Sequence, residues 1–174
     1  MKVLKIVYLS CIVLILVACG RASGETDETV PEGQQSLILS QKESFVSFDW
    51  IEEGYTGLFV PANSKLGQAT ASIIDIYGEP DERGSYEGGD FLTYGKKTFF
   101  INPDTGKSVA IALDISEHRL TEQDLKRALG TPDHSELNEM DNFWMYLYNL
   151  DDFELMFEAE TKEAIIKFVW LREK

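Results

Sequence analysis

The feature that most constrains the fold of this chain is a helix ending that occurs twice, 52 residues apart. Residues 73–81 and residues 125–133 each combine apolar positions at helical spacing with a glycine and then a proline. A glycine at positive φ ends many helices, and a proline soon after it prevents the helix from continuing. The same offset aligns Tyr94 with Tyr146. The pattern predicts a duplicated structural unit.

The similarity continues along the chain, with four extra residues in the second copy. Residues 99–101 align with residues 155–157 at an offset of 56, which places the insertion around residues 149–152. We therefore expect one repeat unit over residues 63–115 and a second over residues 116–174. Because a unit of about 50 residues is marginally stable alone, the two units should share one hydrophobic core.

Each unit is predicted to contain one helix followed by three strands. The second helix opens with Thr121 and Asp124 at the spacing of a capping box, whereas Ala69 occupies the capping position of the first helix. Residues 102–107 have the composition of a tight hairpin turn. Alternating patterns predict the strands of the second unit over residues 143–148, 153–158 and 165–171.

Taken together, these elements predict an α+β domain. Two tandem helix-strand-strand-strand units would form a curved antiparallel sheet of about six strands, with the helices on one face. The lead-in segment over residues 45–62 is expected to add edge strands or to pack on the domain.

The first 18 residues predict an export signal that is not part of the fold. Lys2 and Lys5 precede an apolar run over residues 6–17, which is too short to span a bilayer comfortably as a helix. The run ends in Leu-Val-Ala-Cys-Gly at residues 16–20. This ending resembles the lipobox of bacterial lipoproteins. The resemblance implies cleavage of the signal peptide before Cys19 and attachment of fatty-acyl chains such as palmitate to that cysteine, and two or more chains anchor a protein stably.

Residues 19–44 are predicted to link the lipid to the domain as a flexible acidic tether. Glu25, Asp27, Glu28 and Glu32 lie among small and polar residues, a composition that cannot bury enough apolar surface to fold. As a flexible coil, the tether would span roughly 25–30 Å. We expect the domain to be held at the cell membrane, on its extracytoplasmic side.

The repeated helix ending also resembles a known family. Residues 77–81, residues 129–133 and the strands after them are similar to the YjgB-type lipoproteins of Gram-positive bacteria, which carry domain of unknown function 4309. More distantly, the repeat is similar to the tandem units of beta-lactamase inhibitory protein and of SmpA/OmlA-type lipoproteins. The resemblance covers residues 54–174 and implies the fold, and the family has no established reaction to carry over.

The charge balance and the missing motifs exclude several functions. With 30 Asp and Glu against 16 Lys and Arg, the chain has a net charge of −14, which argues against binding of nucleic acid. The sequence contains no phosphate-binding loop, metal-binding histidine pair or nucleophile motif, so we expect no enzyme activity, cofactor or metal. Acidic segments at residues 81–90 and 133–141 leave a cation or small-ligand site as the alternative.

Aromatic residues on the predicted strands indicate a candidate binding surface. We assign the odd-numbered residues of the 143–148 strand to the helix-covered core, which leaves its even-numbered residues on the other face. The candidate partner-binding face then consists of Tyr94, Phe100, Trp144, Tyr146 and Tyr148. Such side chains are typical of recognition surfaces, and beta-lactamase inhibitory protein binds its partner on a concave sheet face. The alternative is that they pack across strands or lie under the lead-in segment. We therefore expect a non-catalytic adaptor for an envelope protein or peptide.

Overall fold

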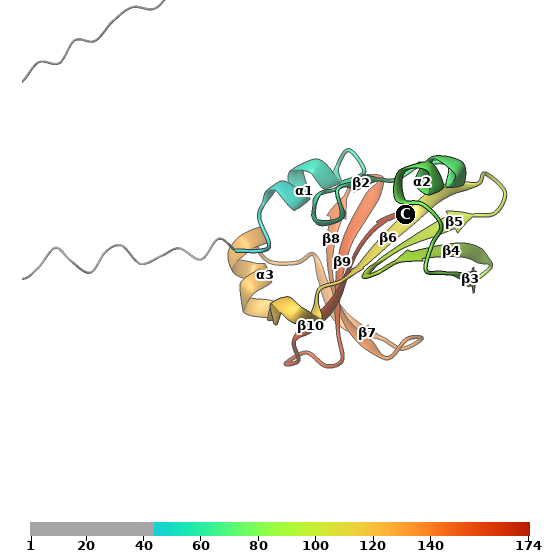
Figure 1. Ribbon diagram of the computed structural model, residues 1–174. Helices are drawn as coiled ribbons and strands as arrows, with labels where there is room; N and C mark the ends of the chain where they lie inside the picture. The colour runs from blue at the N-terminus through green and yellow to red at the C-terminus, as the bar shows by residue number, and fades with distance from the viewer. Residues whose placement is uncertain (1–43) are drawn as a thin grey trace, which may run out of the picture. The chain divides into compact units, whose positions relative to one another are not determined.

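An eight-stranded antiparallel sheet forms the body of this α+β domain (Figure 1). The structure is a computed structural model that describes residues 44–174. The predicted signal peptide, Cys19 and nearly all of the predicted tether lie outside the described residues. The strands follow the order β3-β4-β5-β6-β10-β9-β8-β7 across the sheet. Their bounds are β3 (Glu82–Tyr86), β4 (Gly89–Tyr94), β5 (Lys97–Asn102), β6 (Lys107–Asp114), β7 (His134–Asn138), β8 (Phe143–Leu150), β9 (Phe153–Ala159) and β10 (Ile166–Glu173).

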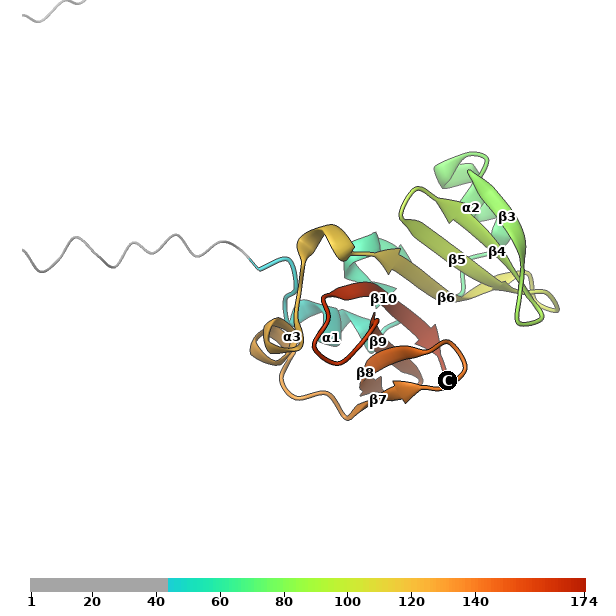
Figure 2. The same ribbon diagram turned by 90° about the horizontal axis from the view of Figure 1, so that it is seen from below.

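The two strands at the centre of the sheet are the last strands of two consecutive meanders. Strands β3 to β6 form the first meander and β7 to β10 the second, and β6 pairs with β10 (Figure 2). In that antiparallel pairing, Leu113 lies opposite Val169 and Ile111 opposite Leu171. These four side chains are apolar and three of them are fully buried, so the join between the meanders lies in the hydrophobic core.

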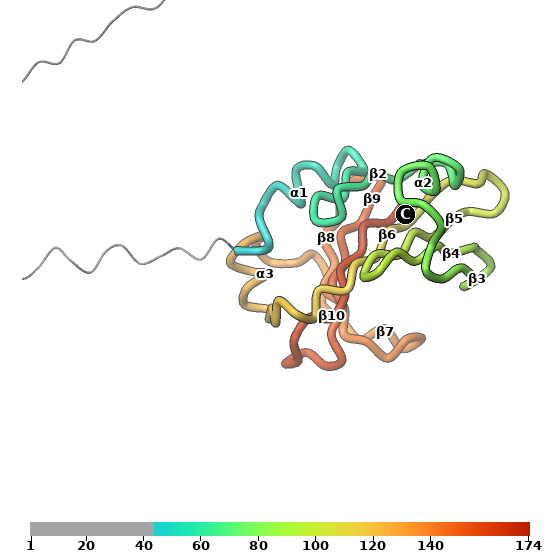
Figure 3. Tube along the Cα trace, viewed as in Figure 1, coloured from blue at the N-terminus to red at the C-terminus, as the bar shows by residue number. Residues whose placement is uncertain are grey.

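Three helices and a small ribbon complete the described residues. The helices are α1 (Asp49–Gly54), α2 (Thr70–Tyr77) and α3 (Glu122–Leu129), with 3-10 turns η1 (Val60–Ala62) and η2 (Ser116–His118). The ribbon pairs β1 (Leu58–Phe59) with β2 (Ser64–Lys65). The lead-in segment therefore forms a helix and a separate ribbon, and the trace in Figure 3 follows it from residue 44 to α2.

The predicted helix boundaries are confirmed in detail. Gly78 and Gly130 end α2 and α3 at φ angles of 81° and 88°. At the start of α3, Thr121 and Asp124 form the predicted capping box. Ala69 provides no side-chain cap for α2. Instead, the backbone N–H of Thr70 donates to the carbonyl of Gly106 in the β5–β6 turn, over 2.9 Å.

The prediction of three strands per unit is wrong, because each helix is followed by four. The segments expected to be acidic loops form β3 and β7, which are the edge strands of the sheet. In the first, Glu87 and Gly88 both adopt positive φ, as the central residues of a type I′ turn do, and this turn folds β3 back onto β4. All five residues of β3 are exposed, so backbone pairing forms a strand that has no apolar alternation.

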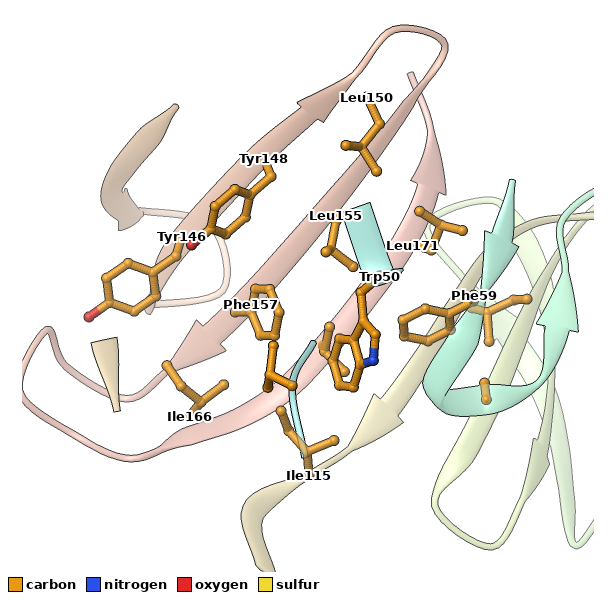
Figure 4. Packing of buried hydrophobic residues seen from close by; sticks show 14 of the residues in the cluster. Trp50, Phe59, Ile115, Tyr146, Tyr148, Leu150, Leu155, Phe157, Ile166 and Leu171 are labelled. Carbon is orange, nitrogen blue, oxygen red and sulfur yellow. The ribbon is translucent and has the colours of Figure 1, made fainter. Parts of the chain in front are cut away.

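Side chains from one face of the sheet form the hydrophobic core together with the lead-in segment and the helices. Trp50 of α1 stacks on Phe157 of β9, with ring centroids 6.2 Å apart. Figure 4 shows Tyr146 and Tyr148 in the same layer as Phe157. On the first meander, Tyr77 of α2 packs against Phe99 of β5. The core face is thus made by even-numbered residues of β8 and odd-numbered residues of β9.

Candidate binding groove

A groove of about 930 Å³ lies over the sheet face opposite to the core residues. We call this surface the groove face. Strand pairing places its residues side by side, because partners in register point to the same side of a sheet. The groove face consists of Phe91, Thr93, Thr98, Phe100, Ala110, Ala112, Asp114, Phe143, Met156, Glu158, Phe168, Trp170 and Arg172. A volume of this size is in the range of small-molecule and peptide sites.

Aromatic side chains cross the groove face from one meander to the other. The rings of Phe100 on β5 and Trp170 on β10 lie 5.0 Å apart, and Phe91 on β4 lies 6.5 Å from Phe100. On the other side of the groove, Phe143 of β8 meets Phe168 of β10 edge to face at 6.1 Å. All five are partly exposed, so both groups of rings present apolar surface to the groove.

A carboxylate lies among these rings. Glu158 lies near the C-terminal end of β9 and is only 5% exposed. The indole Nε1 of Trp170 donates a hydrogen bond to its Oε2 over 2.7 Å. Burial raises the pKa of Glu158 above its usual value, and the charge of Asp141 adds to the increase. The hydrogen bond from Trp170 and the charge of Arg172 oppose it.

An ion pair borders this region on the same face. Nε and Nη2 of Arg172 on β10 both lie 2.8 Å from Oε2 of Glu154 on β9. The two residues are directly opposite each other in the strand pairing, which places their side chains on one side of the sheet. The pair holds the arginine across the strands at one end of the groove.

The two edge hairpins meet at the rim of the groove. The hydroxyl of Tyr86, at the tip of the β3–β4 hairpin, donates to Oδ1 of Asp141 over 3.3 Å. Asp141 belongs to the β7–β8 turn, where its Oδ2 also accepts a hydrogen bond from Asn138 over 2.8 Å. The contact joins the hairpins at the two edges of an eight-stranded sheet, so the sheet curves around the groove.

The predicted binding face is wrong for its two central residues. Tyr146 is 0% exposed and Tyr148 is 5% exposed, so both belong to the core. The hydroxyl of Tyr146 donates to the carbonyl of Lys162, and that of Tyr148 donates to the carbonyl of Gly130. Burial raises the pKa of Tyr146 to about 12 and raises that of Tyr148 further. The two faces of the strand agree with the prediction, but the face buried in the core is the opposite one.

Of the other three predicted residues, one lies in the groove. Phe100 lines it at its centre. Tyr94 packs on Tyr77 at 5.4 Å and donates its hydroxyl to the carbonyl of Gly78 over 3.1 Å. Trp144 packs against the core and donates its Nε1–H to Ser135. The five residues therefore do not form one surface.

The acidic segments at residues 81–90 and 133–141, considered as a cation site, contain carboxylates that accept backbone hydrogen bonds. Oδ2 of Asp81 accepts the backbone N–H of Gly95 over 2.7 Å, and Oδ2 of Asp133 accepts that of Asn149 at the same distance. Within residues 44–174, no group of three or more histidine, cysteine or acidic residues could hold a metal ion. No helix in this range is both long enough and apolar enough to cross a membrane.

The sequence prediction missed most of the groove residues. Phe91, Phe143 and Phe168 alternate with core residues along their strands, and Glu158 and Trp170 do the same. One signal in the sequence identifies the core face. Each Gly-x-Pro helix ending is followed, in the second strand after it, by a tyrosine whose hydroxyl reaches the glycine carbonyl. The strand face with that tyrosine must be the face next to the helix.

A protein of known structure shares the fold of this domain. No protein-family model and no curated protein matches the chain. Among solved structures it is similar to YjgB of Bacillus subtilis, a DUF4309 family protein, with a TM-score of 0.58 and 17% identity over 74% of this chain and 98% of that chain. It is also similar to an extracellular protein containing a SCP domain from Bacillus anthracis, with a TM-score of 0.46 and 13% identity, over 63% of this chain and 44% of that one. The likeness to YjgB confirms, at the level of the fold, the resemblance to DUF4309 proteins.

Proposed function

We propose that this chain is a non-catalytic binding module that holds an envelope protein or peptide in the groove. The observation that supports this most is the row of partly exposed aromatic rings along a groove of about 930 Å³. Monomeric proteins rarely leave a contiguous apolar surface open unless it serves an interaction. Phe91, Phe100 and Trp170 would provide most of the contact area, because aromatic residues are the usual anchors of interfaces.

The rigidity of the groove face supports the same function. Its side chains lie on six adjacent strands, β4, β5, β6, β10, β9 and β8. Each of these strands pairs with its neighbours. The Tyr86–Asp141 contact holds the two edge hairpins together at the rim. A surface that is already ordered loses little conformational entropy when a partner binds, which favours affinity.

The domain is proposed to act from a lipid anchor at the extracytoplasmic side of the cell membrane. The support is the lipobox-like sequence at residues 16–20, which follows a short apolar run. Lipid on Cys19 and an acidic tether would keep the groove near the membrane, where envelope proteins are concentrated.

We propose that the domain arose by duplication of one unit, a helix followed by a meander. In this proposal α2 and α3 lie on the same face of the sheet. The support is a pair of equivalent hydrogen bonds, from Tyr94 to Gly78 and from Tyr148 to Gly130. The two tyrosines are 54 residues apart and the glycines 52, because the β7–β8 turn has two residues more than the β3–β4 turn. The two meanders then form a groove between them that neither would form alone.

Selection of peptides on the purified full-length protein tests the function. A library of random linear peptides is screened against the wild type and then against Ala110→Arg, which places a long side chain at the centre of the groove. Leu137→Arg is the matched control, because Leu137 is 45% exposed and does not line the groove. We expect peptides that bind the wild type and the control but lose at least about tenfold in affinity for the groove variant.

Circular dichroism first verifies that both variants are folded, and Thr98→Arg replaces Ala110→Arg if the latter is not. A set of peptides that bind all variants equally, or the absence of any bound peptide, would contradict the proposed function.

A further inference from the structure

The side chains that line the groove include more acidic than basic residues, so the groove has a net negative charge. Two cations line it, and each is already paired with a carboxylate, Lys96 with Glu117 and Arg172 with Glu154. Six carboxylates line it, namely those of Glu87, Asp104, Asp114, Asp141, Glu158 and Glu173. None of these six forms an ion pair within residues 44–174. The groove therefore attracts positive charge.

The most buried of these carboxylates lies against aromatic rings. Glu158 is opposite Phe168 in the strand pairing, and Trp170 donates to its Oε2. Among the described residues, no hydrogen-bond donor is found for its other oxygen, Oε1, although the residue lines the groove. A carboxylate removed from water in this way has a favourable partner in a cation that enters the groove.

A second carboxylate of the groove, that of Asp141, is near enough to Glu158 to act on its charge. The aromatic rings of Phe143 and Phe168 lie on this side, and the negative faces of such rings also attract cations. Two carboxylates and several rings thus surround one part of the groove.

We infer that the partner is a peptide segment that places a lysine or arginine side chain between Glu158 and Asp141. The apolar stem of the side chain lies along Phe143, Phe168 and Trp170, and its cation lies at the carboxylates. This inference rests on the proposed function, since it specifies the chemistry of a partner bound in the groove.

The charge of the chain favours a separate partner over its own N-terminal segment. Residues 19–43 contain five acidic and two basic residues, so that segment has the same sign of charge as the groove. Like charges placed together in a partly buried groove oppose binding. A basic peptide from another molecule is complementary instead.

The test uses peptides recovered from the selection on the full-length protein, with Glu158→Gln as the variant. Glutamine keeps the shape of the side chain and can still accept the hydrogen bond from Trp170. We expect groove-dependent peptides to be enriched in lysine and arginine, and to bind Glu158→Gln about tenfold more weakly than the wild type. Replacing the key lysine of a peptide by norleucine should cause a similar loss, and the norleucine peptide should bind the wild type and Glu158→Gln equally.

Each outcome of this test is decisive. Groove-dependent peptides without basic residues, or a basic peptide whose affinity changes less than twofold in Glu158→Gln, overturn the inference while the proposed function stands. If no peptide depends on the groove, the proposed function fails and the inference fails with it.

Discussion

The indole of Trp170 and the carboxylate of Glu158 are joined by a hydrogen bond of 2.7 Å on the groove face of the sheet. The contact is between neighbouring strands, β10 and β9, and it gives a buried carboxylate one donor. One hydrogen bond does not replace the water that the ionised group loses, so burial raises the pKa of Glu158. The ionised side chain of Glu158 therefore destabilises the folded domain, while it can attract a cationic partner.

Glu158→Gln should stabilise the domain at neutral pH. The pKa of Glu158 is higher in the folded than in the unfolded state, so its protonated form favours folding and this contribution is lost as pH rises through the folded pKa. The midpoint of thermal unfolding of Glu158→Gln should exceed that of the wild type at pH 7, and the difference should shrink toward pH 4. A difference that is constant with pH would show that the ionisation of Glu158 has no part in it.

Tyr146→Ala should destabilise the domain by about 3–5 kcal/mol, the usual range for loss of a large aromatic side chain from a core. Its ring is fully buried and its hydroxyl donates to Lys162. Met140→Ala is the control, because Met140 is 84% exposed and its change should be within about 0.5 kcal/mol. Urea unfolding measures both. A Tyr146→Ala protein as stable as the wild type would contradict the burial of Tyr146 and support the binding face predicted from the sequence.

Tyr148→Phe should lower the free energy of unfolding by about 0.5–1.5 kcal/mol, since it leaves the carbonyl of Gly130 without its donor. Tyr94→Phe removes the equivalent bond to Gly78, and it should have a smaller effect because that bond is exposed to water. Urea unfolding measures the loss of free energy of unfolding in each variant. Equal losses would show that burial of the hydrogen bond does not change its contribution to stability.

Cys19→Ser should abolish lipid labelling. Cells that express the chain are fed a palmitate analogue, and the purified protein is examined for the label. The wild type should carry it, since the sequence at residues 16–20 predicts acylation of this cysteine. Cys11→Ser is the matched control and should change nothing, because Cys11 lies in the segment predicted to be removed. Label that persists in Cys19→Ser would contradict the lipid anchor.

The helix ends and the β8–β10 strands could be predicted because their signals are local. Gly130 and the Thr121–Asp124 pair specify a helix end and a helix start within one turn each. Residues 143–150 are almost all aromatic or apolar, a composition that favours a strand. β3 could not be found in this way, because its five exposed residues contain no alternation and only the Glu87–Gly88 turn and backbone pairing form it.

The groove could not be located from the sequence because both faces of β8 are rich in apolar residues. Tyr146 and Met145 both suit a core, and alternation shows only that they lie on opposite faces. The choice between the faces depends on contacts distant in sequence, such as that of Trp50 with Phe157. The meeting of Tyr86 and Asp141 depends on the curvature of the whole sheet and has no local signal.

Site-specific photo-cross-linking in the cells that make the protein tests the central claim most directly. A benzophenone amino acid replaces Phe100 in the groove or, as the control, Phe48, which is 52% exposed and does not line the groove. Irradiation should yield a cross-linked adduct from position 100 and none from position 48, and Ala110→Arg in the same chain should remove the adduct. An equal yield from both positions, or no adduct from position 100, would contradict a binding function for the groove.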